Sequence, residues 1–262
     1  MRIYTVDAFT DHPFAGNPAA VCLLEKSAEE DWMQKTAMEM NLSETAFLIK
    51  EKPFHYQLRW FTPSSEVDLC GHATLAAAHI LWERYSVPAE ETLYFHTKSG
   101  QLSASYKQGQ IILDFPIEAP SACSIPDALL DGVSVPILSV EKNRLEYIVE
   151  TTDEEAVLRA APDMREFLKL DTRGVILTAG SSRQKYDFVS RCFYPAIGVE
   201  EDPVTGSAHC GLAPFWEKRL KRSSFSARQA SSRGGDLFVS IEEDRCFIGG
   251  SAVTVLESIL LF

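Results

Sequence analysis

A cysteine, a glycine and a histidine stand directly before a run of small residues that predicts a helix. The stretch DLCGHATLAAAHILWERY, residues 68–85, places Cys70, Gly71 and His72 at that point. A thiol beside an imidazole could form a reactive thiol site or part of a metal site, whereas a glycine there could simply turn the chain into the helix. The choice between these interpretations depends on the rest of the chain.

The same arrangement recurs in the second half of the chain, where EDPVTGSAHCGLAPFWEKR places Thr205, Gly206 and Ser207 before another predicted helix. In both copies a strand-like segment reaches a proline, acidic residues follow, and the helix ends near a Trp-Glu pair. These landmarks, and two capping-box patterns at residues 27–30 and 152–155, recur about 125 to 135 residues apart. The spacing indicates two halves of one design, with chance similarity between two strand–helix units as the alternative.

Each half predicts strands, one amphipathic helix, further strands, a second helix and then strands again. For the first half we expect helices at residues 28–40 and 71–85 and strands at 2–9, 18–25, 45–50, 55–62, 101–106 and 110–115. For the second half we expect a helix from Asp153 that Pro162 interrupts, a helix at 206–219, and strands at 174–179, 186–194, 236–241, 245–249 and 252–256. The proline-rich stretch 116–126 is expected to be a connector, and the stretch 223–235, which is poor in large apolar residues, a loop.

This order of elements predicts an α+β fold of two pseudo-symmetric lobes. We place the N-terminal lobe at residues 1–118 and the C-terminal lobe at 119–262, and we expect the last strand, at about 252–262, to pack back on the N-terminal lobe. A cleft between two lobes is the default place for a small-ligand site.

The two glycine-led helix starts offer a way to bind an anion without Lys or Arg. A helix start exposes about four unpaired amides and carries roughly half a positive charge. Gly71 and Gly206 would let a ligand approach the backbone closely, and two such starts facing one cleft could hold a carboxylate. The alternative is that both glycines are plain turn residues in front of buried helices.

The two halves differ at the positions that could carry out acid–base chemistry. Glu44 lies at the entry to an apolar strand, and the matching segment has Arg173 near that position. A carboxyl group in an apolar cleft has a raised pKa and can take and return a proton near neutral pH, whereas the alternative for a lone glutamate is a solvated surface position. At the helix starts, the thiol of Cys70 is matched by the hydroxyl of Thr205.

Composition and charge exclude several other classes of protein. The formal net charge of −12 argues against nucleic acid, because binding to phosphates draws on clustered Lys and Arg. No apolar run approaches the length that spans a membrane, and six scattered cysteines without a C-x-x-C pair suit the reduced thiols of a cytoplasmic protein. There is no H-E-x-x-H motif, paired Cys/His spacing, G-x-G-x-x-G or Walker pattern, so we expect neither a metal nor a nucleotide cofactor.

Five motifs together resemble the PhzF-like family of phenazine-biosynthesis isomerases, which is related in fold to diaminopimelate epimerase and proline racemase. They extend over essentially the whole chain: VDAFTDHPFAGNPAAV, NLSETAF, FTP followed by DLCGHATLAA, EDPVTGSAH and GGSAVTVLES. The resemblance implies two lobes, each a β-barrel-like sheet around a central helix, with the active site between them, no cofactor or metal, and a homodimer. By motif match, Glu44 is the acid/base residue, and the substrate-contacting residues are His72, Asp202 and Ser207, with Gly71 and Gly206 at the helix starts and Asn17 in the cleft wall.

The racemases related to this family use two thiols on opposite faces of one carbon. Here Cys70 stands where the first thiol would be, but Thr205 takes the place of the second, and a threonine hydroxyl is too weak an acid or base without an activating partner. We therefore expect a cofactor-independent isomerase in which Glu44 moves a proton within a small carboxylic acid, while Cys70 and Thr205 line the site. Two alternatives stay open: a racemase or epimerase that uses Cys70 and one other base, and a carboxylate-binding protein without turnover.

Overall fold

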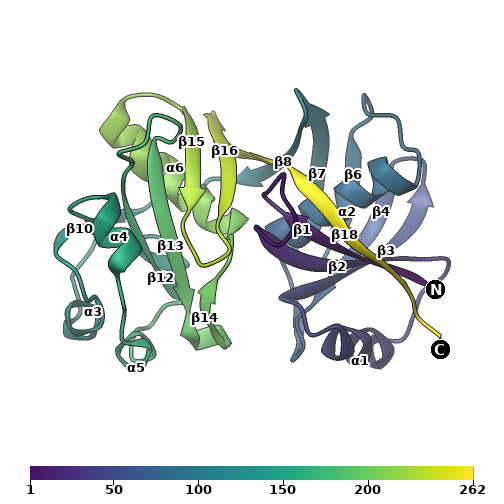
Figure 1. Cartoon of the computed structure of the whole chain (residues 1–262), viewed down its shortest axis with the longest axis horizontal. Helices are drawn as coiled ribbons and strands as arrows, with labels where there is room; N and C mark the ends of the chain where they lie inside the picture. The colour runs from purple at the N-terminus through teal and green to yellow at the C-terminus, as the bar shows by residue number, and fades with distance from the viewer. Residues whose placement is uncertain (262) are drawn as a thin grey trace. The chain divides into compact units, whose positions relative to one another are not determined.

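The computed structural model describes residues 1–261 and divides the chain into two compact units (Figure 1). Unit 1 comprises Met1–Asp114 and the segment from Ile248 onward, and unit 2 is the continuous stretch Phe115–Phe247. The chain passes from unit 1 to unit 2 within strand β8 (Gln110–Pro116) and returns within β17 (Arg245–Gly250).

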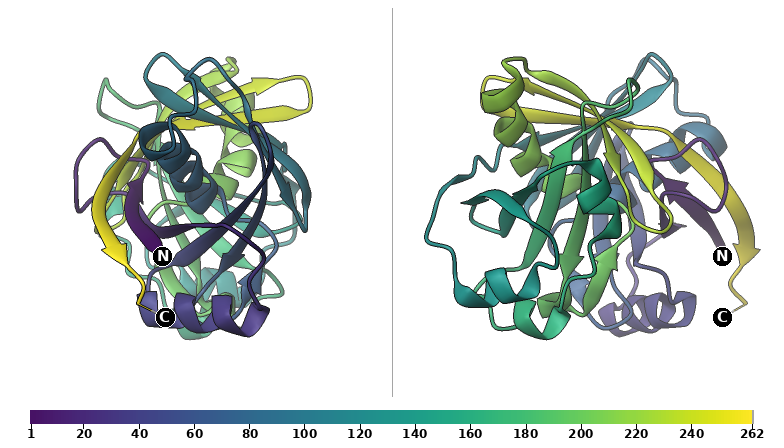
Figure 2. Two further views of the ribbon diagram at one scale, coloured as in Figure 1. Left: turned by 90° about the vertical axis from the view of Figure 1, so that its right-hand side faces the viewer. Right: turned by 60° about the vertical axis from the view of Figure 1, so that its left-hand side comes forward.

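Unit 1 is a curved sheet with two helices. Its strands are β1 (Arg2–Ala8), β2 (Asn17–Leu24), β3 (Glu44–Lys52), β4 (His55–Phe61), β5 (Glu66–Val67), β6 (Leu93–Thr97), β7 (Gly100–Lys107), the first part of β8, and β18 (Ala252–Ile259). Its helices are α1 (Glu30–Met40) and α2 (Gly71–Arg84). Strand β18 runs antiparallel along β1, so the last strand of the chain pairs with the first (Figure 2).

Unit 2 contains one long helix, α6 (Gly206–Leu220), among shorter helices and its own set of strands. The short helices are α3 (Asp127–Gly132), α4 (Glu154–Arg159), α5 (Met164–Phe167) and the 3-10 helix η1 (Pro195–Ile197). The strands are β9 (Ser121–Ala122), β10 (Ile137–Lys142), β11 (Glu146–Thr151), β12 (Gly174–Gly180), β13 (Phe188–Tyr194), β14 (Val199–Asp202), β15 (Ser224–Gln229), β16 (Gly235–Glu242) and the first part of β17.

The ladders of unit 2 repeat those of unit 1 in order and in sense. The pairs β2–β3 and β11–β12 are parallel, and the pairs β3–β4 and β12–β13 that follow are antiparallel. The pairs β4–β6 and β13–β15 are again parallel, and β6–β7 and β15–β16 antiparallel. Each unit thus builds the same sheet, and the predicted α+β fold of two similar lobes is confirmed.

One helix forms the core of each unit. Helix α2 is rich in alanine and leucine and is apolar on all sides, as expected of a helix surrounded by protein, and its exposed residues are confined to its last turn. It packs against β1, β2, β3 and β18, while α6 packs against β11, β15 and β16 of its own unit. No helix in the described part of the chain is both long enough and apolar enough to cross a membrane.

The segment predicted to be a loop, 223–235, is in fact partly a strand. Residues Ser224–Gln229 form β15, which pairs parallel with β13 and antiparallel with β16. Its burial alternates, with Phe225, Ala227 and Gln229 inside. The prediction was wrong because two of these three inward residues are small or polar, so the segment lacks the apolar alternation by which a strand is recognised.

The two capping-box predictions were also wrong in detail. Helix α1 begins only at Glu30, after Glu29, and no side chain caps it. Helix α4 does begin as expected, but its cap is Asp153, whose carboxylate accepts from the backbone N–H of Ala156 over 2.8 Å, and not Thr152. An aspartate at this position supplies the same acceptor as a threonine and adds a charge that the helix dipole favours.

Candidate active site

Unit 1 brings four of the expected site residues together at the start of α2. Glu44 and Asn17 are the first residues of the neighbouring parallel strands β3 and β2, and His72 is the second residue of α2. His72 Nε2 lies 3.0 Å from Glu44 Oε2, while its Nδ1 lies 3.2 Å from Asn17 Nδ2 and 3.5 Å from Cys70 Sγ. The imidazole of His72 therefore stands between a carboxylate on one side and an amide and a thiol on the other.

Charge decides the protonation of His72. Burial alone would lower its pKa, but the neighbouring Cys70 and Glu44 raise it, and the net result is a pKa well above its usual value of 6.5. Burial and the nearby Glu44 raise the pKa of the Cys70 thiol in turn. The raised pKa favours the protonated form of the His72 ring beside Glu44.

The two facing atoms of the Glu44–His72 pair could both form a hydrogen bond to a third group, such as a ligand. Glu44 Oε2 and His72 Nε2 are both buried, and although they lie 3.0 Å apart, neither has a well-aligned hydrogen-bond partner among residues 1–261. Buried polar atoms without a partner are costly, and they cluster where a ligand completes the bonding. Glu44 thus lies beside a polar ring and not among apolar side chains alone.

Glu44, Cys70 and His72 also deserve comparison with a metal site. One donor atom of each lies within 4.8 Å of the other two, which is compact enough for a cation. An imidazole, however, offers a metal one nitrogen at a time, and here the sulfur faces Nδ1 while the carboxylate faces Nε2. The sulfur and the carboxylate therefore contact different nitrogens of the ring, although the sulfur and a carboxylate oxygen also lie within 4.8 Å of one another.

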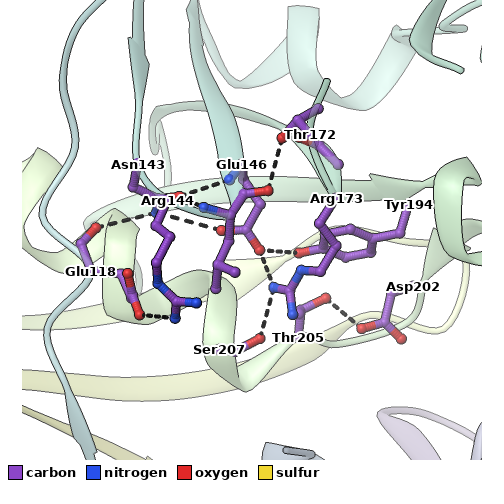
Figure 3. A network of polar contacts seen from close by, with 12 residues as sticks. Glu118, Asn143, Arg144, Glu146, Thr172, Arg173, Tyr194, Asp202, Thr205 and Ser207 are labelled. Atoms are coloured by element: carbon purple, nitrogen blue, oxygen red, sulfur yellow. Dashed lines mark hydrogen bonds and ion pairs between the residues drawn. The ribbon is translucent and has the colours of Figure 1, made fainter. Parts of the chain in front are cut away.

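Unit 2 surrounds the start of α6 with a different polar network (Figure 3). Arg173, which directly precedes β12, donates through Nη2 both to Glu146 and to Ser207 Oγ, the latter over 3.1 Å. Glu146 is the first residue of β11 and is fully buried, and it also accepts from the hydroxyl of Tyr194 over 3.2 Å. The acid–base groups of unit 1 are replaced here by a fixed ion pair.

Asp202 and Thr205 form the second part of this network. The Thr205 hydroxyl donates to Asp202 Oδ2 over 2.5 Å. Gln229 fastens both residues, because its Oε1 accepts from the Thr205 backbone N–H over 2.8 Å and its Nε2 donates to the Asp202 carbonyl oxygen over 2.8 Å. Thr205 thus has its hydroxyl committed to a carboxylate, next to Ser207 at the head of the helix.

The glycines at both helix starts are not required by the turn. Gly71 and Gly206 are the first residues of α2 and α6, both are buried, and neither has a positive φ. Any residue can adopt such backbone angles, so the need for glycine has to come from the space around it. This observation weakens the interpretation of the two glycines as plain turn residues.

Each of the expected site residues therefore lies at or near the start of the long helix α2 or α6 of its own unit. Those of unit 1 are Asn17, Glu44, Cys70, Gly71 and His72, and those of unit 2 are Asp202, Thr205, Gly206 and Ser207. Three further residues, Glu146, Tyr194 and Gln229, were not foreseen. A charged residue inside the apolar run LEYIV was the available signal for Glu146, whereas Gln229 lay in the segment mistaken for a loop.

Comparison with known proteins agrees with this fold. The family described as phenazine biosynthesis-like protein (PhzC-PhzF) matches residues 6–258. An uncharacterized isomerase of Halalkalibacterium halodurans is 53% identical over 262 residues, covering 99% of this chain and 98% of that protein. The crystal structure of a phenazine biosynthesis protein of the PhzF family from Enterococcus faecalis has 45% sequence identity and a TM-score of 0.94, with 99% of each chain covered.

A more distant structure shares the fold alone. A probable proline racemase from Agrobacterium radiobacter matches 99% of this chain and 92% of its own, with a TM-score of 0.67 and 10% identity. Together these matches show an isomerase with the fold of the epimerases and racemases. The chain belongs to the phenazine biosynthesis-like family, the family that its motifs resembled.

Proposed function

We propose that the protein is a cofactor-independent isomerase that moves a proton within a small carboxylic acid. Glu44 is the acid/base residue, and it acts in a cleft between the two units. The observation that carries the proposal is the pair of buried atoms Glu44 Oε2 and His72 Nε2, 3.0 Å apart and without aligned partners. A carboxylate held beside an imidazolium can remove a proton from one carbon and return it to another.

The other site residues hold the substrate in this proposal. The starts of α2 and α6, at Gly71 and Gly206, grip its carboxylate through their unpaired amides. The imidazolium of His72 stabilises negative charge on the conjugated intermediate that forms after proton removal, and Asp202 and Ser207 orient the substrate. Asn17 supports the proposal through its side-chain amide, which contacts His72 Nδ1 over 3.2 Å. An imidazolium donates from that nitrogen, so the amide must present its oxygen to the ring.

Hydrogen exchange in deuterated water tests the proposal. A panel of small unsaturated and hydroxylated carboxylic acids is incubated with the protein, and loss of carbon-bound protons is followed by NMR. Wild-type protein should exchange at least one acid, and Glu44→Gln should lower the rate by about 10²- to 10⁴-fold, the usual contribution of an acid/base residue. Exchange that survives in Glu44→Gln contradicts the assignment of Glu44.

A racemase or epimerase that uses Cys70 is the second candidate, and one contact favours it. Cys70 Sγ lies 3.5 Å from His72 Nδ1, so an imidazole is available to activate the thiol. Burial raises the pKa of that thiol, and the opposite position holds Thr205, whose hydroxyl is bonded to Asp202. If Glu44 is the base, Cys70→Ser should leave the exchange rate within about tenfold of wild type. Loss of exchange in Cys70→Ser together with retained exchange in Glu44→Gln selects the racemase. Tight binding of an acid without exchange selects the binding protein.

Cytoplasmic location and a homodimer complete the proposal. All six cysteines are free thiols, which supports a reducing compartment. The homodimer rests on the family resemblance, and light scattering of the purified protein at several concentrations decides it. The partner of the site is a small carboxylic acid, with no role for nucleic acid or a membrane.

A further inference from the structure

Arg173 holds in unit 2 the place that Glu44 holds in unit 1. Glu44 is the first residue of β3 and contacts the second residue of α2, His72. Arg173 directly precedes β12, the strand that corresponds to β3, and donates to the second residue of α6, Ser207. The repeated topology therefore places a guanidinium where the other unit has a carboxylate.

Glu146 and Tyr194 hold the Arg173 guanidinium in position. Fully buried Glu146 accepts from Nη2, and the guanidinium lies 5.0 Å from the centre of the Tyr194 ring. Nε of Arg173 is also buried and has no hydrogen-bond partner in the described part of the chain, while 28% of the side chain remains exposed. A buried donor without a partner lowers the stability of the folded protein. The Arg173–Glu146 pair is therefore not arranged for stability alone.

The bond between Arg173 and Ser207 determines which way the serine hydroxyl can donate. A guanidinium has donors only, so Ser207 Oγ must accept from it, over 3.1 Å. The proton of the Ser207 hydroxyl is then left to donate elsewhere, beside the unpaired amides at the start of α6. In unit 1 the corresponding group is the carboxylate of Glu44, which has acceptors only and lies 3.0 Å from His72 Nε2.

We infer that Arg173 is a positioning residue that makes Ser207 a fixed hydrogen-bond donor, so that unit 2 selects an anionic oxygen of the substrate over a neutral one. The inference rests on the proposed function, which places the substrate carboxylate at the start of α6. It assigns selectivity for that carboxylate to the Arg173–Glu146 pair, which lies behind Ser207. The protein has a net charge of −12, which repels an anion, and fixed local donors offset this repulsion at the site.

Benzoate and benzamide are suitable probes, because they differ in charge and hardly in shape. Their dissociation constants are measured by NMR titration of the wild-type protein and of Ser207→Ala. They are also measured for the double variant Arg173→Met with Glu146→Gln, which removes both charges and strands neither. We expect the affinity for benzoate to fall about tenfold in each variant, the equivalent of one charge-assisted hydrogen bond, while the affinity for benzamide stays within a factor of two.

Combining the variants separates positioning from a merely structural role. If Arg173 acts through Ser207, the triple variant should bind benzoate no more weakly than Ser207→Ala does. Additive losses, or equal losses for benzoate and benzamide, overturn the inference. A wild-type protein that does not prefer benzoate overturns it as well.

Two single variants provide controls. Arg144→Met removes an exposed arginine of the same unit, which pairs with Glu118 over 2.6 Å, and should leave both dissociation constants unchanged. Arg173→Lys keeps a charge beside Glu146 and therefore the fold, but the compact ammonium cannot reproduce the fork of the guanidinium. It should still lose benzoate affinity by about threefold to tenfold, and an unchanged affinity contradicts the inference even if the double variant fails to fold.

The readout distinguishes this inference from the proposed function. Selectivity for benzoate is a binding measurement, whereas the isomerase proposal is tested by hydrogen exchange. If the wild-type protein exchanges an acid but the Arg173 variants still prefer benzoate to the same extent, the inference is wrong and the proposed function stands. If the preference for benzoate depends on Arg173 but no acid is exchanged, the proposed function is wrong and the inference stands.

Discussion

Units 1 and 2 place side chains at the same points of the same topology, yet with opposite electrical character. At the head of α2, a carboxylate and an imidazole face one another over 3.0 Å, and both are groups that can exchange a proton. At the head of α6, the corresponding groups are a guanidinium, which cannot lose its proton, and a hydroxyl. The difference separates a part of the protein suited to proton transfer from a part suited to holding charge in place.

The comparison also predicts whether substitution in each unit affects activity or stability. Glu44 keeps some contact with solvent, and its partner His72 can give up its proton if the carboxylate is removed. Glu146 is fully buried, and its partner is an arginine, which cannot give up its proton. Unit 1 should therefore lose activity on substitution, whereas unit 2 should lose stability.

The largest expected effect on stability is that of Arg173→Met alone. It strands the buried carboxylate of Glu146 and should lower the free energy of unfolding by about 3–5 kcal/mol. Glu44→Gln, at the matching position, should change it by no more than about 1 kcal/mol. Urea denaturation measures both. Equal losses would show that the two ion pairs do not differ in the way described, and recovery in Arg173→Met with Glu146→Gln would confirm the cause.

A second contrast concerns the histidines of the two central helices. Burial lowers the pKa of His209 to about 4, whereas that of His72 is raised. The neutral His209 ring is favoured by folding, so its contribution is complete above pH 6.5 and is lost as the pH falls toward 4, by about 3 kcal/mol in all.

Substitution of His209 tests this acid sensitivity. His209 Nδ1 contacts the Thr205 carbonyl oxygen over 2.9 Å, and an asparagine amide can make the same bond. Thr74 makes the equivalent bond in unit 1, to the Cys70 carbonyl oxygen over 2.6 Å. Urea denaturation between pH 4 and pH 7 should show a flatter dependence for His209→Asn than for wild type. An unchanged slope assigns the acid sensitivity to other groups.

Gln229, the last residue of β15, bonds to both Thr205 and Asp202 before α6, and this pair of bonds gives a smaller prediction. Gln229→Leu removes the partner of the Thr205 amide and the donor to the Asp202 carbonyl oxygen, and should cost about 1–3 kcal/mol. Thr97 ends the corresponding strand β6 and bonds only within its own turn, to Gly100, so Thr97→Val should cost less than about 1 kcal/mol. Thermal unfolding of the two variants compares them; a larger loss in Thr97→Val would contradict this stabilising role of Gln229.

The last prediction is a limb of the pH profile. The raised pKa of His72 favours its protonated ring, so the stability that this ring contributes is present below pH 6.5 and is lost as the pH rises through the pKa of the folded protein. Exchange that depends on the imidazolium should then fall about tenfold per pH unit above that pKa. Rates measured in buffered deuterated water from pH 6 upward check this, and His72→Gln should show no such limb.

The sequence predicted the two helix starts well because they are local features. A small-residue helix that begins at a glycine after an extended residue is visible within the segments around Gly71 and Gly206, and the observed helices begin at those residues. The repeat of landmarks then predicted the repeat of topology. The association of Glu44 with His72 came from the family resemblance, because spacing along the chain does not show which strand enters beside which helix.

Buried polar residues were the part that the sequence could not reveal. Glu146 and Gln229 look like solvated residues in a strand and a loop, and only partners far along the chain make their burial possible. Glu146 needs Arg173, and Gln229 needs Thr205, so neither can be interpreted from its neighbours in sequence. The same inward polar residue concealed β15, whose third inward side chain is Gln229.

The pairing of β1 with β18 also sets an order of assembly. Unit 2 is one continuous stretch of the chain, whereas the sheet of unit 1 is completed only by Ala252–Ile259, which pairs with Arg2–Ala8. During synthesis from the N-terminus, unit 2 can finish its core while unit 1 still lacks its last strand. Closing that pairing joins residues from the two ends of the chain, a contact of high sequence separation that forms slowly. The head of α2, which carries Glu44 and His72, therefore belongs to the part of the molecule that matures last.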